Sequence, residues 1–567
     1  KAASAADPIS FKQAMSSPNA AAWTEAITSE LAAHVSRKTW SITVLPAGKT
    51  AIPCKWVFKT KKGPTPGDEK KKARLVIKGF KQQHGIDFED TYAPTVRISS
   101  IRAVLAHAVA HDWVVQQVDV DTAFLYAQLE EEVYMEIPEG IELISGTDCA
   151  PSHEEMQDAG IQKRKLVARL NRALYGLKQA PRAWHQELTC ILQGLGYIQS
   201  YIDQGVYYRF LHDKIHCVLL VYVDDVLIIS PHMQAATEFK TDFMKHVNIK
   251  DLGACKQILG IKVQKEEQGI SLNQSDILHQ LLVDTGMSNC SPVSTPMLST
   301  YYLNRSAAHA HDPAIDSVDH TALSHSELKH YQSTVGSLLY VSICTRPDLS
   351  FAVSVLCRSM ASPSKHDLQA LRHLLKYIKG TVDEKLYLGM QRQGVQTFSD
   401  SSYADCKKTG KSTAGHAIQF MGGTVDWKSQ LQQTVALSTA EAEYMSAATA
   451  IRETQGLVQL LMEIGLVAGT QKMQLYVDNA AAKAMAEATA SSSRTRHIAV
   501  RFHYIRDLVT EGQLEILYVS TAAQLADVLT KPLAAPSFTP AASRLLGSTA
   551  AVPAYTVGAI QARNNFC

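Results

Sequence analysis

The sequence has few of the features that mark secreted, membrane-spanning and zinc-binding proteins. Its ten cysteines form no Cys-x-x-Cys pair among the 567 residues, which argues against a zinc module and against a secreted disulfide framework. The most apolar run, residues 218–229, contains Asp224 and Asp225, so it cannot span a bilayer. The N-terminus has no signal-peptide pattern. We therefore expect an intracellular protein with no membrane partner.

A strong excess of charge of one sign is also missing. The 56 basic and 54 acidic residues leave a formal net charge of +2, so bulk charge does not indicate a nucleic-acid partner. Basic side chains do gather between Lys55 and Lys81. This stretch predicts either a phosphate-binding surface or a solvated charged face, and charge alone does not decide between them.

The chain is too long for one hydrophobic core, because domains usually contain about 100 to 200 residues. Its first residue, Lys1, suggests a processed or excised piece of a longer protein. Residues 51–265 mix strand and helix patterns, residues 266–390 are mostly helical, and a second α/β pattern occupies residues 391–533. We expect residues 1–50 to be an N-terminal extension and the Ala/Ser/Pro-rich residues 534–567 to be a disordered tail.

Hydrophobic periodicity predicts an α+β fold for the first of these blocks. The segments "KWVFK" and "ARLVIK" alternate as strands do, and "ISSIRAVLAHAVAH" has the period of a helix. The segment "HCVLLVYVDDVLIIS" predicts two strands joined by a tight turn that carries Asp224 and Asp225. An Asp-rich hairpin turn is the ordinary interpretation. The alternative is a cation site, because two adjacent like charges between apolar strands repel each other and are poorly solvated.

A second predicted strand favours the cation site, because "VVQQVDVD" adds Asp119 and Asp121 and three converging carboxylates can hold two metal ions. The segments "QVDVDTAFL", "LYGLKQAPRAWH" and "VYVDD", in this order, resemble the palm motifs of copia-type (Pseudoviridae) LTR retrotransposon Pol polyproteins. The similarity extends over most of residues 50–533, for example in "CKWVFKTKK" and "KKARLVIKGFKQQHGIDFEDTYAPTVR". The resemblance implies an α+β multidomain chain: a right-hand polymerase with fingers, palm and thumb, then a connection and an α/β RNase H-like domain.

The resemblance implies catalytic carboxylates in the palm. Asp119, Asp224 and Asp225 would hold two Mg²⁺ ions, with Mn²⁺ as an alternative, because hard oxygen ligands suit such cations. Strand alternation puts Asp121 on the same face as Asp119, which makes it a competing choice. We favour Asp119, because the following Phe124 then falls at the family's spacing.

Substrate-binding residues are implied in the same way. Lys72 and Arg74 resemble the finger residues that hold a triphosphate, since guanidinium geometry matches phosphate oxygens. Phe124 resembles the side chain that stacks below the incoming sugar and excludes a 2′-hydroxyl, although a core aromatic is the alternative. The segment that would support template and nucleotide contributes Gly176, Lys178 and Gln179.

Four carboxylates in the second α/β block have the layout of an RNase H site. They lie after a strand, on a helix, at the end of another strand and on a late helix, and they are Asp400, Glu443, Asp478 and Asp527. Each has an ordinary alternative, such as Asp478 capping a helix or Asp527 on a solvated helix face. Because they occur together and follow a reverse transcriptase pattern, we predict a second site for two Mg²⁺ ions.

Helix capping separates two neighbouring glutamates. "STAE" has the capping-box pattern, in which Glu441 returns to the Ser438 amide. Glu443 is two residues further along the helix and points about 200° away from Glu441 at 3.6 residues per turn. Glu443 is therefore the predicted metal ligand.

Three further motifs receive minor roles. Leu259-Gly260-Ile261 resembles a primer-grip hairpin, with core packing as the alternative. Arg494 to His497 resembles a basic phosphate-contacting helix, and His497 is expected at the surface, outside the active site. Asp284-Thr285-Gly286 has the form of an aspartic protease motif, but it follows a helical stretch, so Gly286 is predicted to end a helix.

These patterns together predict a reverse transcriptase with RNase H activity. The expected partners are an RNA template, a DNA or tRNA primer, RNA–DNA hybrids and dNTPs, with a homodimer or an association with integrase as options. The expected location is a cytoplasmic virus-like particle or the nucleus. A catalytically silent, transposon-derived nucleic-acid-binding scaffold is the main alternative, and a DNA-templated polymerase or repair nuclease is another. The presence of all seven carboxylates argues against the silent scaffold.

Overall fold

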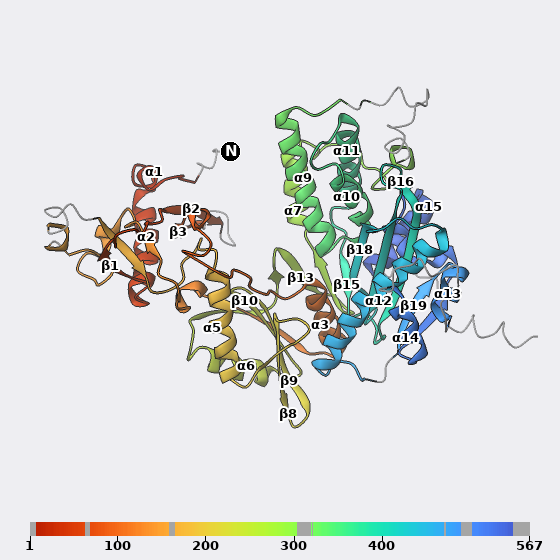
Figure 1. Ribbon diagram of the computed structural model, residues 1–567, viewed down its shortest axis with the longest axis horizontal. Helices are drawn as coiled ribbons and strands as arrows, with labels where there is room; N and C mark the ends of the chain where they lie inside the picture. Colours follow the sequence, from red (N-terminus) through yellow and green to blue (C-terminus); the bar gives the residue numbers. More distant parts are fainter. Residues whose placement is uncertain are drawn as a thin grey trace, which may run out of the picture.

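The computed structural model describes residues 7–62, 69–152, 154–157, 165–302, 319, 321–469, 472–488 and 502–547. Figure 1 shows an open arrangement, with the N-terminal hairpin and helices on one side, a central sheet with α3, α5 and α6, and the helical and C-terminal α/β parts on the other side. The N-terminal part and α9 face each other across a gap between the ribbons, above the central sheet.

Residues 7–50, the described part of the stretch predicted as an extension, contribute to the N-terminal core. Helices α1 (Phe11–Met15) and α2 (Ala20–Ser36) precede the hairpin formed by β2 (Cys54–Lys62) and β3 (Glu69–Ile77). Trp23 of α2 packs edge-on against Phe58 of the hairpin, with 5.2 Å between ring centroids. Asp7 accepts a hydrogen bond from the Thr60 amide at 3.0 Å. The extension therefore braces the hairpin from which the predicted finger residues project.

The central six-stranded sheet has the order β11-β4-β10-β9-β8-β7. Alternate side chains along its strands enter two cores, as the period of two residues requires. Val226 and Ile228 pack with α5 and α6, whereas Leu227 and Ile229 pack with α3. The elements are β4 (Val114–Val120), β7 (Ile198–Gln199), β8 (Val206–Leu211), β9 (Lys214–Tyr222), β10 (Asp225–Ser230), β11 (Ile249–Ala254), α3 (Ile98–Ala110), α5 (Ala180–Gly194) and α6 (Met233–Phe243).

Two smaller sheets flank the central one. The first has the order β1-β6-β5 and lies in the N-terminal part, and the second has the order β12-β13-β14-β15 and joins the central sheet to the helices that follow. Their bounds are β1 (Trp40–Val44), β5 (Tyr134–Met135), β6 (Leu166–Leu170), β12 (Gln257–Ile258), β13 (Ile261–Lys265), β14 (Ile270–Asn273) and β15 (Leu386–Leu388). Short 3-10 helices are η1 (Gly79–Lys81), η2 (Ala123–Tyr126) and η3 (Ile141–Ile144).

The middle of the chain is helical, as its sequence period predicts. It contains α7 (Ser275–Asp284), α9 (His325–Cys344), η5 (Pro347–Leu349), α10 (Ser350–Cys357) and α11 (Lys365–Gly380). Ser324 caps α9 and Ser364 caps α11, each in a reciprocal capping box. After α7, Gly286 adopts a left-handed φ of 69°, as expected for a residue that ends a helix.

The C-terminal part is built on a five-stranded sheet of order β18-β17-β16-β19-β20. Its first three strands are antiparallel, and β19 and β20 run parallel to β16. The 25-residue helix α12 packs on β16 and β17. The elements are β16 (Gln396–Cys406), β17 (Lys411–Phe420), β18 (Gly423–Leu431), α12 (Thr439–Glu463), β19 (Met473–Val477), α13 (Ala480–Glu487), α14 (Tyr504–Thr510), β20 (Leu514–Tyr518), η7 (Thr521–Ala523), η8 (Leu525–Leu529) and α15 (Ala535–Leu546).

Two sequence-based expectations for this part need correction. The predicted disordered tail contains α15, which buries Phe538 and Leu545 and ends at Gly547 with a φ of 72°. The helix was missed because its sequence is rich in Ala, Ser and Pro. The predicted late helix around Asp527 is the short 3-10 helix η8.

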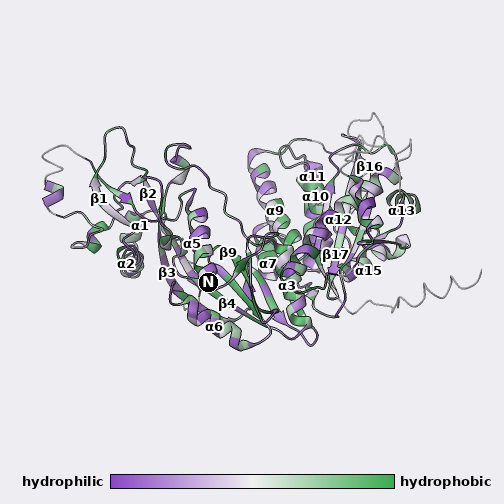
Figure 2. Cartoon of the chain, turned by 60° about the horizontal axis from the view of Figure 1, so that its bottom comes forward, coloured by the Kyte–Doolittle hydropathy of each residue, from purple (hydrophilic) through white to green (hydrophobic). Residues whose placement is uncertain are grey.

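A buried arginine joins the central and C-terminal parts. Arg102 of α3 donates to the carbonyl oxygens of Val425 at 2.7 Å, Ile343 at 2.6 Å and Cys344 at 3.0 Å. Its guanidinium lies 3.8 Å from the centroid of the Trp427 ring. In Figure 2, hydrophobic colour dominates α3, which lies at the centre of the chain. Within the described parts of the chain, no helix is long and apolar enough to cross a membrane.

Candidate active sites

The first site lies at one end of the central hairpin. Strands β9 and β10 are joined by Val223 and Asp224 alone, and Asp225 begins β10 opposite Tyr222. On its other side, β10 pairs with β4 so that Asp225 lies directly opposite Asp119. Opposite residues on neighbouring antiparallel strands have Cβ atoms about 4.5–5.5 Å apart. The backbone register therefore brings together the carboxylates that the sequence predicted.

The turn that carries Asp224 is held in an unusual backbone conformation. Val223 has a φ of 60°, which is strained for a β-branched residue. Its carbonyl oxygen accepts a 2.7 Å hydrogen bond from the indole nitrogen of Trp184 on α5. The Asp224 carbonyl oxygen accepts a 2.9 Å bond from the Val120 amide. Trp184 is thus a positioning residue that the sequence analysis missed, although it lies within the quoted "APRAWH" segment.

Like charge and burial govern the electrostatics of this site. Burial raises the pKa of Asp119 and of Asp225, and the neighbouring Asp224 carboxylate raises both further. Gln117 opposes the shift at Asp225 by donating a 3.3 Å hydrogen bond to its Oδ1. Carboxyl groups whose pKa values rise for these reasons favour a nearby cation.

Asp121 differs from Asp119 in its surroundings. Strand β4 ends at Val120, and the next residue, Asp121, is exposed. Thr122, which follows it in the sequence, has a φ of 51°. The expected strand alternation therefore stops before Asp121, and only Asp119 has Asp225 opposite it.

A chain of side chains connects the β2–β3 hairpin to this site. Burial lowers the pKa of Lys72, and the nearby Arg74 lowers it further, whereas Asp119 acts in the opposite direction. The Arg74 guanidinium lies 4.7 Å from the centroid of Tyr175. The Tyr175 ring in turn meets Phe124 edge-on at 4.8 Å. Lys72, Arg74 and Phe124 therefore lie around the side of the site nearest the hairpin.

The segment after β6 mainly supports the loop that follows β3. Gly176 has a φ of 97°, and a Cβ there would lie 2.2 Å from the Ile77 carbonyl oxygen, so glycine is required. The Lys178 amide donates to Gln82 Oε1 at 2.8 Å. Gln179 donates to the Asp87 carbonyl oxygen at 2.9 Å and is only 2% exposed. The Gln179 side-chain amide is engaged in internal hydrogen bonds, and the role of this segment in supporting template and nucleotide stays a prediction.

The predicted primer-grip residues form a tight turn between β12 and β13. Leu259 and Gly260 both have positive φ values, 50° and 71°. The Tyr340 hydroxyl of α9 donates a hydrogen bond to the Leu259 carbonyl oxygen. Ile261 is buried, so it belongs to the core.

The second site gathers three carboxylates from three elements of the C-terminal sheet layer. Asp400 lies within β16, Glu443 on α12, and Asp478 directly after β19. One oxygen from each lies within 4.8 Å of the others, and no other set of three or more such groups meets this criterion among the described residues. The oxygens of the palm carboxylates therefore lie further apart than those of the second site.

Glu443 is the most perturbed member of the second site. Its Oε1 accepts a 3.2 Å hydrogen bond from the Ser401 amide, and its buried Oε2 has no hydrogen-bond partner within the described ranges. Burial, followed by the charges of Asp400 and Asp478, raises the pKa of Glu443 to about 10. An orphaned buried oxygen beside two like charges fits a divalent cation bound by hard oxygen ligands.

Asp527 joins this cluster through a lysine that the sequence analysis overlooked. Lys531 Nζ lies 2.9 Å from Asp527 Oδ1 and 3.6 Å from Asp400 Oδ2. Burial and then Asp400 raise the pKa of Asp527 to about 7, although Lys531 opposes this rise. The Thr530 hydroxyl also donates to Asp400. The spacing of Asp527 and Lys531, four residues apart in "ADVLTK", was the available signal.

The caps around the second site differ in detail from those expected. Ser438 does cap α12 by accepting from the Glu441 amide at 3.2 Å. Glu441 Oε2 accepts a 2.9 Å hydrogen bond from the Leu437 amide. The predicted donor was the amide of the next residue, Ser438. The cap of α13 is Asn479 and not Asp478, which removes the ordinary alternative for Asp478. Arg494 to His497 lie outside the described residues.

Comparisons with known proteins identify the family of the chain, and the matched family model spans the first site. Residues 37–299 match the family model described as reverse transcriptase (RNA-dependent DNA polymerase). The chain is 36% identical over 527 residues to the retrovirus-related Pol polyprotein from transposon TNT 1-94 of Nicotiana tabacum, covering 93% of this chain and 38% of that protein. It is 34% identical over 526 residues to the corresponding polyprotein from transposon RE1 of Arabidopsis thaliana, covering 92% and 34%.

A solved structure of a foamy viral protease-reverse transcriptase in complex with double-stranded DNA matches with a TM-score of 0.46 at 10% identity. The matched region covers 88% of this chain and 69% of the foamy viral chain.

The family match and the mixed α/β architecture define the class as a multidomain reverse transcriptase fold followed by an RNase H-like domain. This chain belongs to the copia-type LTR retrotransposon Pol polyproteins. It spans between 34% and 38% of the length of these two relatives. The predictions of family and of fold class are therefore confirmed. Membership in the reverse transcriptase family also implies the use of a divalent metal ion.

Proposed function

We propose that this chain is an RNA-directed DNA polymerase that also hydrolyses the RNA strand of RNA–DNA hybrids. The observation that carries the polymerase part is the register that sets Asp119 opposite Asp225 beside the Val223–Asp224 turn, inside the region matched by the reverse transcriptase family. The substrates would be an RNA template, a DNA or tRNA primer and dNTPs. The reaction joins the primer 3′-oxygen to the α-phosphorus of a dNTP and releases pyrophosphate.

In the polymerase site, Asp119, Asp224 and Asp225 would hold Mg²⁺, with Mn²⁺ as an alternative. The ion would lower the pKa of an attacking hydroxyl or water and neutralise charge on the phosphate. Lys72 and Arg74 would bind the triphosphate oxygens, because Lys72 interacts electrostatically with Asp119 and Arg74 lies against Tyr175, which contacts Phe124. Phe124, held edge-on by Tyr175, would contact the sugar and exclude a 2′-hydroxyl.

In the second site, Asp400, Glu443, Asp478 and Asp527 would hold the metal. Glu443 Oε2 is buried without a hydrogen-bond partner among the described residues, which supports this assignment. Asp400 and Asp478 would orient a water molecule toward an RNA phosphodiester. Recognition of the RNA strand would rest on its 2′-hydroxyl groups and on the shape of the hybrid.

The test is a pair of assays on purified protein with and without Mg²⁺. The first extends a labelled DNA primer on RNA and on DNA templates, and the second follows cleavage of labelled RNA in a preformed hybrid. We expect metal-dependent extension on RNA and cleavage of hybrid RNA, with no cleavage of the same RNA as a single strand. Intact folding and hybrid binding with neither activity would replace this proposal with the silent nucleic-acid-binding scaffold.

A further inference from the structure

The helix that carries Glu443 also reaches the palm. On α12, Glu463 follows Glu443 by 20 residues, which is about 30 Å along the helix axis at a rise of 1.5 Å per residue. Glu463 Oε2 accepts a 2.6 Å hydrogen bond from the Ser200 hydroxyl, and its Oε1 accepts a 2.8 Å bond from the Tyr201 amide. One helix therefore carries a carboxylate of the second site and also binds the β7–β8 connection, residues 200–205, of the palm.

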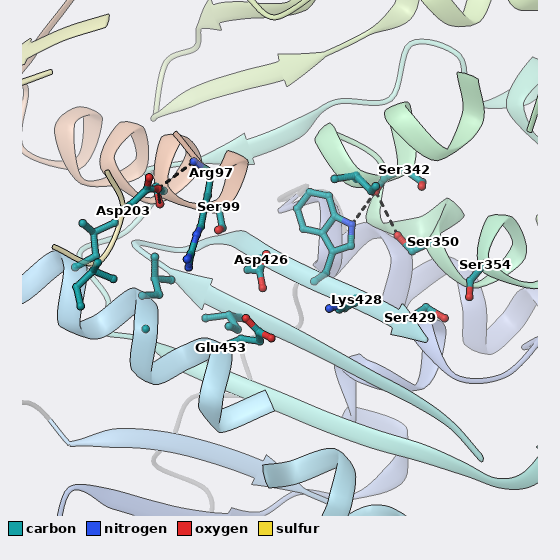
Figure 3. A pocket seen from close by; sticks show the side chains of 18 of the residues that line it. Arg97, Ser99, Asp203, Ser342, Ser350, Ser354, Asp426, Lys428, Ser429 and Glu453 are labelled. Carbon is teal, nitrogen blue, oxygen red and sulfur yellow. Dashed lines mark hydrogen bonds between the residues drawn. The ribbon is translucent and has the colours of Figure 1, made fainter. Parts of the chain in front are cut away.

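The β7–β8 connection is bound in turn to the start of α3. Ser200 Oγ accepts a 3.1 Å hydrogen bond from the Asp203 amide. Asp203 Oδ2 accepts from the Arg97 amide at 3.0 Å and from the Ser100 hydroxyl at 2.7 Å. Figure 3 marks the hydrogen bond between Asp203 and Arg97. The segment that Glu463 contacts is therefore held in place by the helix behind the central sheet.

The same connection is hydrogen-bonded to the strand that leads into the polymerase turn. The Gly205 amide donates to Asp203 Oδ1 at 3.1 Å, and the Gly205 carbonyl oxygen accepts a 2.8 Å bond from the Val221 amide of β9. Val221 lies three residues before Asp224. A series of hydrogen bonds therefore joins Glu463, at the end of α12, to the strand that carries the palm carboxylates.

Close packing alone does not hold this junction together. A cavity of about 380 Å³ lies between the start of α3, α9, α10, β18 and α12, and its lining includes Asp203 and Leu460. Protein interiors contain few voids larger than a water molecule. Polar contacts cross the junction instead: Arg102 of α3 donates to the Val425 carbonyl oxygen of β18 at 2.7 Å. Glu463 supplies the corresponding contacts at the C-terminal end of α12.

We propose that Glu463 is a positioning residue that fixes how many base pairs separate the primer end in the polymerase site from the RNA phosphate cut in the second site. A hybrid duplex that occupies both sites is cut where its RNA strand meets Glu443, so the orientation of α12 on the palm sets this number. Glu463 lies about 30 Å along the helix from Glu443 and acts on the reaction only through that orientation. The inference rests on the proposed function, because it requires both activities in one chain.

The test maps RNA cuts relative to the primer end. The full chain extends a DNA primer on an end-labelled RNA template, in Mg²⁺, to a stop set by omitting one dNTP, and the cut positions are read from that stop. The wild type should cut within a narrow window. Glu463→Ala should spread the cuts over about two to three more nucleotides, because a shift of about 3.4 Å along the duplex moves the cut by one base pair. The rates of extension and of cleavage of a long preformed hybrid should stay within about threefold of the wild type.

Two further variants serve as controls. Glu453→Gln removes the same charge from α12, but Glu453 pairs with the adjacent Arg452 at 3.3 Å, so the cut window should be that of the wild type. Glu463→Gln keeps an acceptor oxygen for the Tyr201 amide and should broaden the window less than Glu463→Ala does.

The outcomes separate this inference from the proposed function. A broader window in Glu463→Ala, with both rates close to those of the wild type, supports the role of Glu463. An unchanged window, an equal broadening in Glu453→Gln, or a parallel loss of both rates without a change of window overturns it and leaves the two activities in place. Absence of extension or of hybrid cleavage in the wild type would instead refute the proposed function, and this inference with it.

Discussion

The two carboxylate sites of this chain are built differently. The palm carboxylates are half-buried at a hairpin turn, and Lys72, whose charge acts on Asp119, comes from a separate hairpin. In the second site Asp400 and Glu443 are 2% and 7% exposed, and Lys531 pairs with the cluster from the same small domain. The palm site is thus assembled from separate parts across an open surface, whereas the second site is compact and largely preformed.

The largest predicted effect separates Glu443 from its neighbour Glu441. Glu443→Gln should lower RNA cleavage by roughly 10³-fold, the scale of removing one charged group from a catalytic centre, and leave primer extension unchanged. Glu441→Gln, which removes the charge that accepts from the Leu437 amide at the start of α12, is the matched control and should keep most of the cleavage. A similar loss in both variants, measured as cleavage rate at saturating Mg²⁺, would contradict the compact-site description.

The equivalent pair in the palm is Asp119 and Asp121. Asp119→Asn should lower primer extension by about 10² to 10³-fold, because it removes the carboxylate opposite Asp225. Asp121→Asn should lower it by less than about tenfold, because Asp121 is exposed beyond the end of β4. The measurement is the single-turnover extension rate on an RNA template. The reverse order of effects would move the palm site to Asp121.

A smaller effect is expected for sugar selection in the palm. Phe124→Val should raise incorporation of ribonucleotides relative to deoxyribonucleotides by about 10- to 100-fold, the usual range for one steric contact. RNA cleavage should not change, since Phe124 lies in the other site. Phe80→Val, at a residue 76% exposed after β3, is the control. Unchanged discrimination in Phe124→Val would assign this ring to the core alone.

The second site should also make the metal-free protein sensitive to pH. The folded pKa values of Glu443, about 10, and Asp527, about 7, both exceed their ordinary values of 4.5 and 3.8. The stabilisation linked to these two protons is therefore fully present below about pH 4. It is lost as the pH rises through the folded pKa, which is about 7 for Asp527 and about 10 for Glu443. In EDTA the free energy of unfolding should fall between about pH 5 and pH 8.

Glu443→Gln should reduce this fall, because its side chain does not titrate, whereas Asp225→Asn in the palm site should change it less. The measurement is urea unfolding followed by a probe in the C-terminal part. Identical pH dependence in the wild type and Glu443→Gln would show that burial of Glu443 beside Asp400 and Asp478 does not determine how the stability of the metal-free protein depends on pH.

The smallest predicted effect concerns Lys531. Lys531→Met should destabilise the metal-free protein by about 1 kcal/mol, a modest value because the lysine side chain is 34% exposed. The loss should shrink when Mg²⁺ is present, because the ion would then neutralise the carboxylates instead. Lys483→Met removes a partly exposed pair on α13 and is the control. A loss of stability that Mg²⁺ leaves unchanged would give Lys531 a purely structural role.

Local sequence patterns predicted the elements that carry both sites. The apolar strands around Asp224 and Asp225 and the period of α3 were visible because each depends on a few neighbouring residues. Asp478 at the end of β19 could be found in the same way. In each case the side-chain period and the end of the apolar run identify the element.

The features that sequence missed depend on contacts between distant segments. Trp184 reaches the Val223 carbonyl oxygen across 39 positions of the chain, and the packing of α15 rests on burial of Phe538 and Leu545. The internal bonds of Gln179 require the loop after β3 to fold back onto it. Such contacts follow from topology, which local periodicity does not specify.

The central claim is that one chain carries two independent metal-dependent sites. Its most direct test follows both strands of one reaction, a labelled primer on a labelled RNA template, in Asp225→Asn and Asp478→Asn. Asp225→Asn should stop extension while cleavage of preformed hybrid RNA continues, and Asp478→Asn should do the reverse. Loss of both activities in either variant, with the fold intact by circular dichroism, would contradict two separate sites.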